Sequence, residues 1–290
     1  MRNRSSIIDS GMNKLANERR AQVVRALVEG NSIRATVRMT GVAKNTIAKL
    51  LVDLGEACAK YHAENVNEVP SRRIQCDEIW SFCYAKAKNV PTDKKGEFGY
   101  GDVWTWTAID ADSKLCVSWL VGTRDALTAR EFMEDVAKRL QYRVQLTTDG
   151  HKAYLTAVDV AFGGNIDYAM LQKLYGKQGD PENPETRYSP GVCTGVKLEK
   201  VSGSPDPKHI STSYVERQNL TMRMSMRRFT RLTNAFSKKV LNLSAAIALH
   251  FVYYNFCRVH QTLKTTPAVA SGLADHVWSI DEIVGLLDSN

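Results

Sequence analysis

The strongest constraint on the fold is a change in hydrophobic periodicity near residue 66. Before it, apolar residues recur at helical spacing, as in NERRAQVVRALV. After it, RRIQCDEIWSFCYAK is long, aromatic-rich and β-prone, and further strand-like and helical segments follow. The chain therefore predicts an all-α domain over residues 1–66, an α/β domain over residues 67–273 and a C-terminal tail over residues 274–290.

The N-terminal domain has the helix-capping and turn residues that are typical of a helix-turn-helix. Ser32 is a good N-cap for the helix IRATVRMT, and Gly41 permits a tight turn before the helix AKNTIAKLLVDLGEACAKYH. A plain helical bundle is the alternative. The helix-turn-helix interpretation is favoured because the start of the last helix carries polar side chains suited to phosphate and base-edge contacts. These predicted DNA contacts are Lys44, Asn45, Thr46 and Lys49.

The second domain predicts a mixed sheet. The strand around Asp77 is followed by VWTWTAID and LCVSWLVGT, which Asp112, Ser113 and Lys114 join as a hairpin. A helix (TAREFMEDVAKRL), a strand (RVQLTTD), a helix (HKAYLTAVDVAF) and a strand (IDYAMLQK) come next. The order is β-β-β-α-β-α-β, which indicates an α/β layer.

The segment after the fifth strand has the composition of an inserted loop. Five of the eight prolines fall in the region from about residue 175 to residue 209, which predicts an extended loop or flap. Two helices are expected beyond it, at about 212–228 and 237–258.

Three carboxylates occupy chemically suggestive positions. Asp77 interrupts an apolar strand, and Asp149 ends another strand just before Gly150. Asp149 alone would be read as a turn or helix cap. Glu216 is the one acidic residue between positions 211 and 240, where seven lysines and arginines occur. We interpret that segment as a DNA-contact helix, the alternative being a solvated basic helix. The predicted DNA contacts on it are Asn219, Arg223, Arg227 and Arg228.

Three such carboxylates can hold two hard divalent cations, which would catalyse in-line phosphoryl transfer. Mg²⁺ suits this chemistry, and Mn²⁺ is a possible substitute. Glu78 is set aside as a ligand because alternation along a strand directs it to the opposite sheet face. Asp110 and Asp112 are interpreted as turn residues of the hairpin.

Several motifs together resemble a known group of proteins. DEIWSF, WTAID, TTDGHKAY, VERQNLTMRMSMRRFTRLTNAFSKK and YYNFCRVHQTLKTTPA resemble bacterial transposases of the insertion-sequence-one type, in the RNase H-like DDE transposase and integrase superfamily. The resemblance covers nearly all of residues 73–273. It implies an RNase H-like mixed sheet flanked by helices, with Asp77, Asp149 and Glu216 as the catalytic metal ligands.

The same resemblance implies a function. It predicts binding to the double-stranded DNA of element ends, phosphodiester hydrolysis that frees a 3′-hydroxyl, and strand transfer into target DNA. Synapsis of two ends predicts a homo-oligomer. A catalytically inactive or domesticated DNA-binding regulator and an RNase H-like nuclease without joining activity are the alternatives.

Composition agrees with a polyanionic partner. The net charge is +8 and the pI is near 9.1. The six cysteines are scattered, and neither a secretory leader nor an apolar run of about 18 residues is evident in the sequence. We therefore expect a cytoplasmic, nucleoid-associated bacterial protein that does not interact with membranes.

Overall fold

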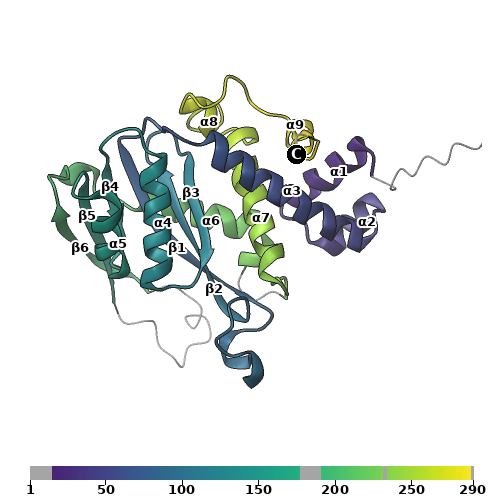
Figure 1. Ribbon diagram of the computed structural model, residues 1–290, viewed down its shortest axis with the longest axis horizontal. Helices are drawn as coiled ribbons and strands as arrows, with labels where there is room; N and C mark the ends of the chain where they lie inside the picture. The colour runs from purple at the N-terminus through teal and green to yellow at the C-terminus, as the bar shows by residue number, and fades with distance from the viewer. Residues whose placement is uncertain (1–14, 177–190, 231–233, 289–290) are drawn as a thin grey trace, which may run out of the picture.

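The computed structural model describes residues 15–176, 191–230 and 234–288 (Figure 1). Its N-terminal helices are α1 (Asn17–Val28), α2 (Ile33–Thr40) and α3 (Lys44–Asn65). Ser32 Oγ accepts from Ala35 N at 3.1 Å and so caps α2, and Gly41 ends that helix in the left-handed region at φ 69°. The expected helices and turn are present. Their use as a DNA-reading helix-turn-helix stays a prediction.

From sequence, residues 65–71, which include Pro70, are interpreted as a linker between the two domains, but in the structure this segment is packed into the protein. Val66 and Val69 are both fully buried. The backbone of Val69 accepts a hydrogen bond from Gln141 N at 3.1 Å and donates one to Arg139 O at 2.8 Å. The end of α3 is therefore packed rigidly against the α/β part of the chain and is not joined to it by a flexible linker.

Helix α3 also lies directly against α7 (Val240–Val252) (Figure 1). A Cβ added to Gly55 would lie 2.4 Å from Ala245 Cα, so only glycine permits this approach. Residues of the N-terminal helices, such as Val24 and Leu54, share one hydrophobic core with residues of the sheet and of α7.

The sheet has six strands in the order β3-β2-β1-β4-β5-β6. Strands β1 to β3 are antiparallel, β1, β4 and β5 are parallel, and β6 runs antiparallel to β5. Along the chain, the first five strands and the two helices between them follow the predicted order β-β-β-α-β-α-β, and the mixed sheet is consistent with an RNase H-like fold. The strands are β1 (Arg73–Cys83), β2 (Gly101–Asp110), β3 (Cys116–Gly122), β4 (Gln145–Thr148), β5 (Asp167–Tyr175) and β6 (Cys193–Ser202).

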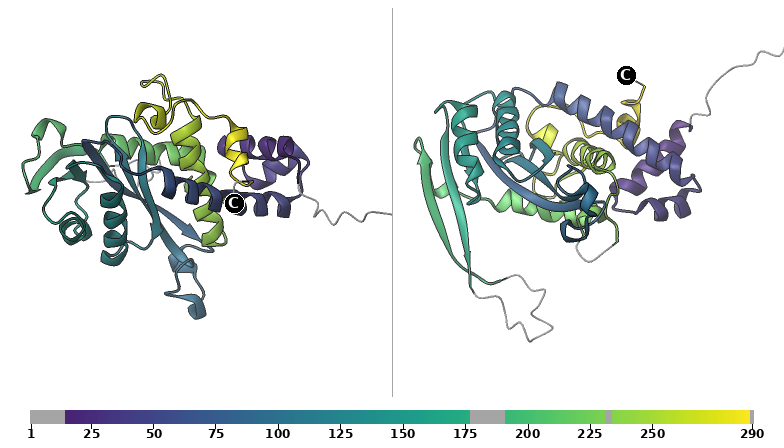
Figure 2. Two further views of the ribbon diagram at one scale, coloured as in Figure 1. Left: turned by 45° about the horizontal axis from the view of Figure 1, so that its top comes forward. Right: turned by 60° about the horizontal axis from the view of Figure 1, so that its bottom comes forward.

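Helices cover both faces of the sheet (Figures 1 and 2). On one face, α4 (Ala126–Arg139) and α5 (Ala153–Phe162) pack on Trp106 through Phe132 and Tyr154. On the other, α6 (Ser213–Ser225) and α7 pack on a cluster that includes Ile79 and Val103. Shorter elements are the 3-10 turns Ala87–Asn89, Thr92–Lys94, Pro207–His209 and Arg227–Phe229, the π-helical turn Tyr253–Cys257, α8 (Pro267–Ala270) and α9 (Ile280–Gly285).

Two sequence-based expectations differ from the structure. Part of the predicted 175–209 loop is strand β6, while residues 177–190 lie outside the described residues. Because β6 is exposed along almost its whole length, its sequence carries no burial pattern that would reveal a strand. The basic helix also ends at Ser225 rather than near residue 228, and Arg227 lies in the following 3-10 turn.

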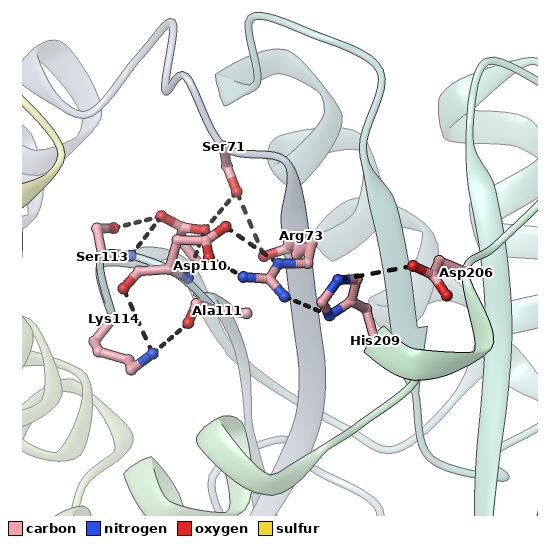
Figure 3. A network of polar contacts seen from close by, with 9 residues as sticks. Ser71, Arg73, Asp110, Ala111, Ser113, Lys114, Asp206 and His209 are labelled. Atoms are coloured by element: carbon pink, nitrogen blue, oxygen red, sulfur yellow. Dashed lines mark hydrogen bonds and ion pairs between the residues drawn. The ribbon is translucent and has the colours of Figure 1, made fainter.

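A polar network fixes the β2–β3 hairpin to the start of β1 (Figure 3). Buried Asp110 accepts hydrogen bonds from Ser71 Oγ at 2.7 Å and from Ser113 N at 3.0 Å. Arg73 forms an ion pair with Asp112, and its Nη1 lies 2.6 Å from His209 Nδ1. Asp110 and Asp112 thus organise the turn, as predicted, and they anchor β1 four residues before Asp77.

One helical segment, Val240–Cys257, has the length and apolar composition of a membrane span, with a mean hydropathy of 1.3. From sequence, a helix is expected here, at about 237–258, whereas an apolar run of about 18 residues is not, so this segment differs from the second expectation. It runs along α3 and the sheet, and most of it is buried inside the protein, where an ordinary core helix passes the same test.

Candidate metal centre

Asp77 lies in the middle of β1, on the sheet face that α6 covers. Its Oδ1 accepts a hydrogen bond from Glu78 N at 2.8 Å, and its Oδ2 accepts one from Asn219 Nδ2 at 2.8 Å. Burial raises the pKa of Asp77 to about 7, and the negative charges of Asp149 and Glu216 add to that rise. A carboxylate held in this way gains from a nearby cation.

Asp149 follows directly after β4, at the carboxyl end of that parallel strand. Its Oδ1 accepts from His151 N at 2.9 Å, which fixes the carboxylate in a short turn. Because β1 and β4 are neighbours in the sheet, the end of β4 places Asp149 beside Asp77. The prediction that these two aspartates share a site is consistent with this geometry.

Glu78 belongs to the same cluster, although the sequence reasoning set it aside. One carboxylate oxygen each of Asp77, Glu78 and Asp149 lies within 4.8 Å of the others. The side chain of Glu78 is 1% exposed, and its Oε1 has no hydrogen-bond partner among the described residues. Burial, followed by the charge of Asp149, raises the pKa of Glu78 to about 8.

Strand alternation explains why Glu78 is missed from sequence. It pairs in register with Trp106, whose ring faces α4 and α5, so Glu78 extends from the face opposite Asp77. Asp149 lies at a strand end, however, where side chains from either face can reach it. The one sequence signal is an acidic residue at a strand position flanked by apolar neighbours.

Arg124 is a second residue that the sequence did not indicate. It follows β3, and its Nη2 lies 3.2 Å from Glu78 Oε2 and 3.6 Å from Asp149 Oδ2. Its guanidinium carbon lies 4.7 Å from the centre of the Trp104 ring, which supports the guanidinium by a cation–π contact. Arg124 therefore supplies positive charge to two of the clustered carboxylates.

Glu216 lies in the first turn of α6, near Asp77 but outside the three-residue cluster. Its Oε1 accepts from Thr212 Oγ1 at 2.7 Å, and its Oε2 forms an ion pair with Lys173 of β5. The two side chains of this pair are 38% and 31% exposed, so water screens their attraction. Lys173 thus holds the carboxylate that the sequence predicted as the third ligand.

The donors present suit a hard divalent cation. All are carboxylate oxygens, and one of them is buried without a hydrogen-bond partner among the described residues. Mutual repulsion and burial raise the pKa of both Asp77 and Glu78, and a bound cation would relieve that repulsion. The cluster therefore fits Mg²⁺ or Mn²⁺, without distinguishing between them.

The structure separates the predicted DNA contacts into groups. Lys44, Asn45, Thr46 and Lys49 are exposed at the start of α3, where Lys49 pairs with Asp53 at 2.6 Å. Arg227 is exposed and Arg228 is partly buried, just after α6.

Two predicted contacts on α6 itself differ in setting. Asn219 is 3% exposed and donates its side-chain amide to Asp77, so it faces the carboxylates rather than solvent. Arg223 lies in the last turn of α6 and is partly exposed. The use of Asn219 and Arg223 as DNA contacts stays a prediction.

Fold and site together define a mixed α/β protein with a carboxylate cluster, suited to divalent cations, at its central strands. No protein-family model matches the sequence, and no curated protein is similar to it. Among solved structures, the chain is similar to a piggyBac transposase synaptic complex with hairpin DNA, at 11% identity and a TM-score of 0.40, covering 99% of this chain and 73% of that one.

Mos1 transposase structures are also similar. The paired-end complex with the left transposon end shares 13% identity at a TM-score of 0.24, covering 54% of this chain and 60% of that one. The mariner paired-end complex with Mn shares 9% identity at a TM-score of 0.29, covering 83% and 76%. Similarity at this level establishes no family, and the likeness to insertion-sequence-one transposases stays a prediction.

Proposed function

We propose that the protein is a DDE-type DNA transposase that cuts DNA at element ends to free a 3′-hydroxyl and joins that end to target DNA. The main support for this proposal is that carboxylate oxygens of Asp77, Glu78 and Asp149 lie close together, and that Glu216 lies nearby on a basic helix. Carboxylates from a central strand, a neighbouring strand end and a helix are an arrangement that holds divalent ions against a phosphodiester.

Asp77, Asp149 and Glu216 would hold the ions, Mg²⁺ or its substitute Mn²⁺, with Glu78 as a further oxygen donor. Two such ions, when bound, activate the attacking oxygen and stabilise the leaving oxygen of an in-line phosphoryl transfer. The chain's own contribution is to keep the carboxylates in position. Asn219 and the backbone N–H of Glu78 fix Asp77, and the turn to His151 fixes Asp149.

Positive side chains complete the site. Arg124 stands beside Glu78 and Asp149, and Lys173 beside Glu216. Both are partly exposed, so they can turn toward an incoming phosphate when an ion neutralises the carboxylates. Arginine at such a place would bind a phosphate through two parallel hydrogen bonds.

The partner proposed for this site is double-stranded DNA, both as element ends and as target. The exposed polar residues at the start of α3 would contact one part of the duplex, and Arg223 and Arg227 another. A homo-oligomer that brings two ends together and a location on the bacterial nucleoid in the cytoplasm belong to the same proposal.

The test is a cleavage and joining assay with a labelled duplex that carries the DNA flanking the gene, and a supercoiled plasmid as target. With Mg²⁺ or Mn²⁺, the wild-type protein should nick the labelled duplex and transfer the label to the plasmid. Asp77→Asn and Asp149→Asn should lower both products by at least about a hundredfold, as loss of an electrostatic catalytic contact does.

Asp159→Asn is the matched control, because Asp159 is an exposed aspartate on α5 outside the cluster. It should retain wild-type rates. Undiminished joining in Asp77→Asn or Asp149→Asn would contradict the mechanism. Nicking without transfer would favour a nuclease, and DNA binding without either product would favour a regulator.

A further inference from the structure

A large cleft lies between the N-terminal helices and the segment that follows α6. Its volume is about 710 Å³. One wall is formed by the α1–α2 turn and the starts of α2 and α3, and the other by residues around Ser225–Arg228 and Asn234–Lys239. The carboxylate cluster does not line it, so the cleft is a separate site.

Its lining is strongly basic. Among the described residues, six cationic side chains and no acidic side chain line the cleft, and we call it the basic cleft. Five of the six are exposed, so they are free to reach a ligand. Its cations are Arg34, Lys44, Arg227, Arg228, Lys238 and Lys239.

Within the described residues, these charges have no carboxylate as an ion-pair partner. None of the six forms an ion pair with a carboxylate in residues 15–176, 191–230 and 234–288, although the same residues contain many ion pairs elsewhere. Arg228 is the most enclosed of them, and its Nη1 donates to the buried Ser237 Oγ. Burial lowers the pKa of Arg228, so an anion in the cleft would relieve an unfavourable charge.

Two helices add to the positive potential of the cleft. Helix α3 starts at Lys44, and α7 follows Lys239, so the first turns of both border the cleft. Neither helix has a side-chain cap on its first turn. Their free backbone N–H groups carry partial positive charge and are suitable donors to phosphate oxygens.

From these observations we infer that the basic cleft binds the phosphate backbone of nucleic acid. A nucleic acid strand presents closely spaced phosphates that can contact both walls at once, and Asn234 and Asn242 add neutral side-chain donors to the lining. The inference rests on the proposed function for the choice of duplex DNA as the ligand.

Helix α6 connects the basic cleft to the carboxylate cluster. Glu216 is in its first turn, and Met226, which lines the cleft, is its C-cap. At 1.5 Å per residue, the ten steps along the chain from Glu216 to Met226 correspond to a rise of roughly 15 Å. One DNA duplex lying along α6 could therefore contact both sites, with the cleft holding phosphates away from the bond that is cut.

The experiment measures binding of the full-length protein to a short fluorescent duplex of arbitrary sequence, by anisotropy over a series of salt concentrations and without divalent ions. Each phosphate contact contributes about 0.9 to the slope of log affinity against log salt. The double variant Lys238→Ser with Lys239→Ser removes two such contacts and should reduce the magnitude of that negative slope by about 1.8. Arg34→Ser with Lys44→Ser, from the opposite wall, should lower it similarly.

Lys86→Ser with Lys88→Ser is the charge-matched control, because both lysines are exposed on the β1–β2 connection away from the basic cleft. Its slope should equal that of the wild type. An unchanged slope in either cleft variant, or an equal loss in the control, would overturn the inference. Thermal unfolding of each variant checks that the fold is retained.

Poly-glutamate serves as the competing polyanion. If the cleft variants lose affinity for poly-glutamate but not for DNA, the ligand is an acidic polypeptide and the inference is wrong. Because the binding assay contains no divalent ion and forms no product, its outcome is independent of the cleavage assay. Failure of catalysis and failure of cleft binding are therefore distinguishable.

Discussion

The side-chain amide of Asn219 donates a hydrogen bond to Asp77 Oδ2 over 2.8 Å and thereby joins α6 to the middle of β1. The other carboxylate oxygen of Asp77 is held by a backbone N–H, so both oxygens have fixed positions. A donor to the ionised form lowers the pKa of a carboxyl group, and here it opposes the rise caused by burial.

Asn219→Ala should therefore raise the pKa of Asp77 above about 7. A hydrogen bond to a charged group is worth about 1.5 kcal/mol or more, which corresponds to a rise of about one unit. When Mn²⁺ binding is measured by calorimetry at a series of pH values, the pH midpoint of binding should be higher in the variant by about the same amount. Thr221→Ala is the control on the same helix, since its hydroxyl donates to the backbone oxygen of Arg217 in the same helix. An identical pH midpoint in Asn219→Ala and wild type would contradict this role.

The raised pKa values of Asp77 and Glu78 predict that the metal-free protein loses stability as pH rises. Their pKa values are about 7 and 8, against 3.8 and 4.5 for the free groups. Between the two sets of values the folded protein binds more protons than the unfolded chain, so the free energy of unfolding falls with increasing pH. His62 and His250, whose pKa values are lowered to about 3 by burial, oppose this fall only below about pH 6.5.

Chemical denaturation between about pH 6.5 and pH 8 measures this loss with little contribution from the histidines. The double variant Asp77→Asn with Glu78→Gln should show a flatter dependence on pH than the wild type. Added Mg²⁺ should stabilise the wild type most at the upper end of the range, and the variant hardly at all. Parallel pH profiles for the two proteins would show that these carboxyl groups do not have raised pKa values.

Lys173→Met should strengthen divalent-ion binding. Lys173 pairs with Glu216 in the metal-free protein, so an ion that uses Glu216 must displace it. Partly exposed pairs are worth up to about 1 kcal/mol, which predicts a gain in Mn²⁺ affinity of up to about fivefold. Lys197→Met, which breaks the exposed pair with Glu199 on β6, should leave the affinity unchanged. Weaker binding in Lys173→Met would show that the lysine supports the ion site.

Gly55→Ala should destabilise the protein. The new methyl group would lie 2.4 Å from the backbone of Ala245, so α3 and α7 must move apart, at a cost of about 1–3 kcal/mol. Gly285→Ala is the matched control, because a Cβ there would meet no atom of the described residues within 4 Å. Urea unfolding should show the loss in Gly55→Ala alone. Equal stability of the two variants would mean that the α3–α7 contact can relax freely.

Much of the fold is predictable from local patterns because most elements bury one face. The strand around Asp77, the hairpin through Asp112 and the helix that caps at Ser32 each carry a periodicity or turn signal. Strand β6 escapes prediction since it lies exposed at the sheet edge and its apolar residues do not mark a buried face. The linker prediction for residues 65–71 fails because Pro70 is typical of a linker, whereas Val66 and Val69 in the same segment are fully buried.

The candidate site is predictable only in part. Asp77 stands out because an acidic residue is unusual within an apolar strand, whereas Asp149 alone has the position of a turn residue and gains its role only together with the other motifs. Glu78 and Arg124 join the site through the end of β4 and the loop after β3, and no spacing in the sequence brings these segments together. The hydrogen bond from Asn219 to Asp77 could not be predicted either, since a helix face drawn from sequence does not reveal which of its side chains turn inward.

The packing of Gly55 against Ala245 has a consequence for how the proposed enzyme would measure DNA. Helix α3 and the buried segment at Val66 and Val69 act as a rigid strut between the N-terminal helices and the sheet. A flexible tether would let a bound end be cut at varied distances. Because the connection is rigid, we expect the number of base pairs between the recognised sequence and the cut to be constant and to be set by the shape of one molecule.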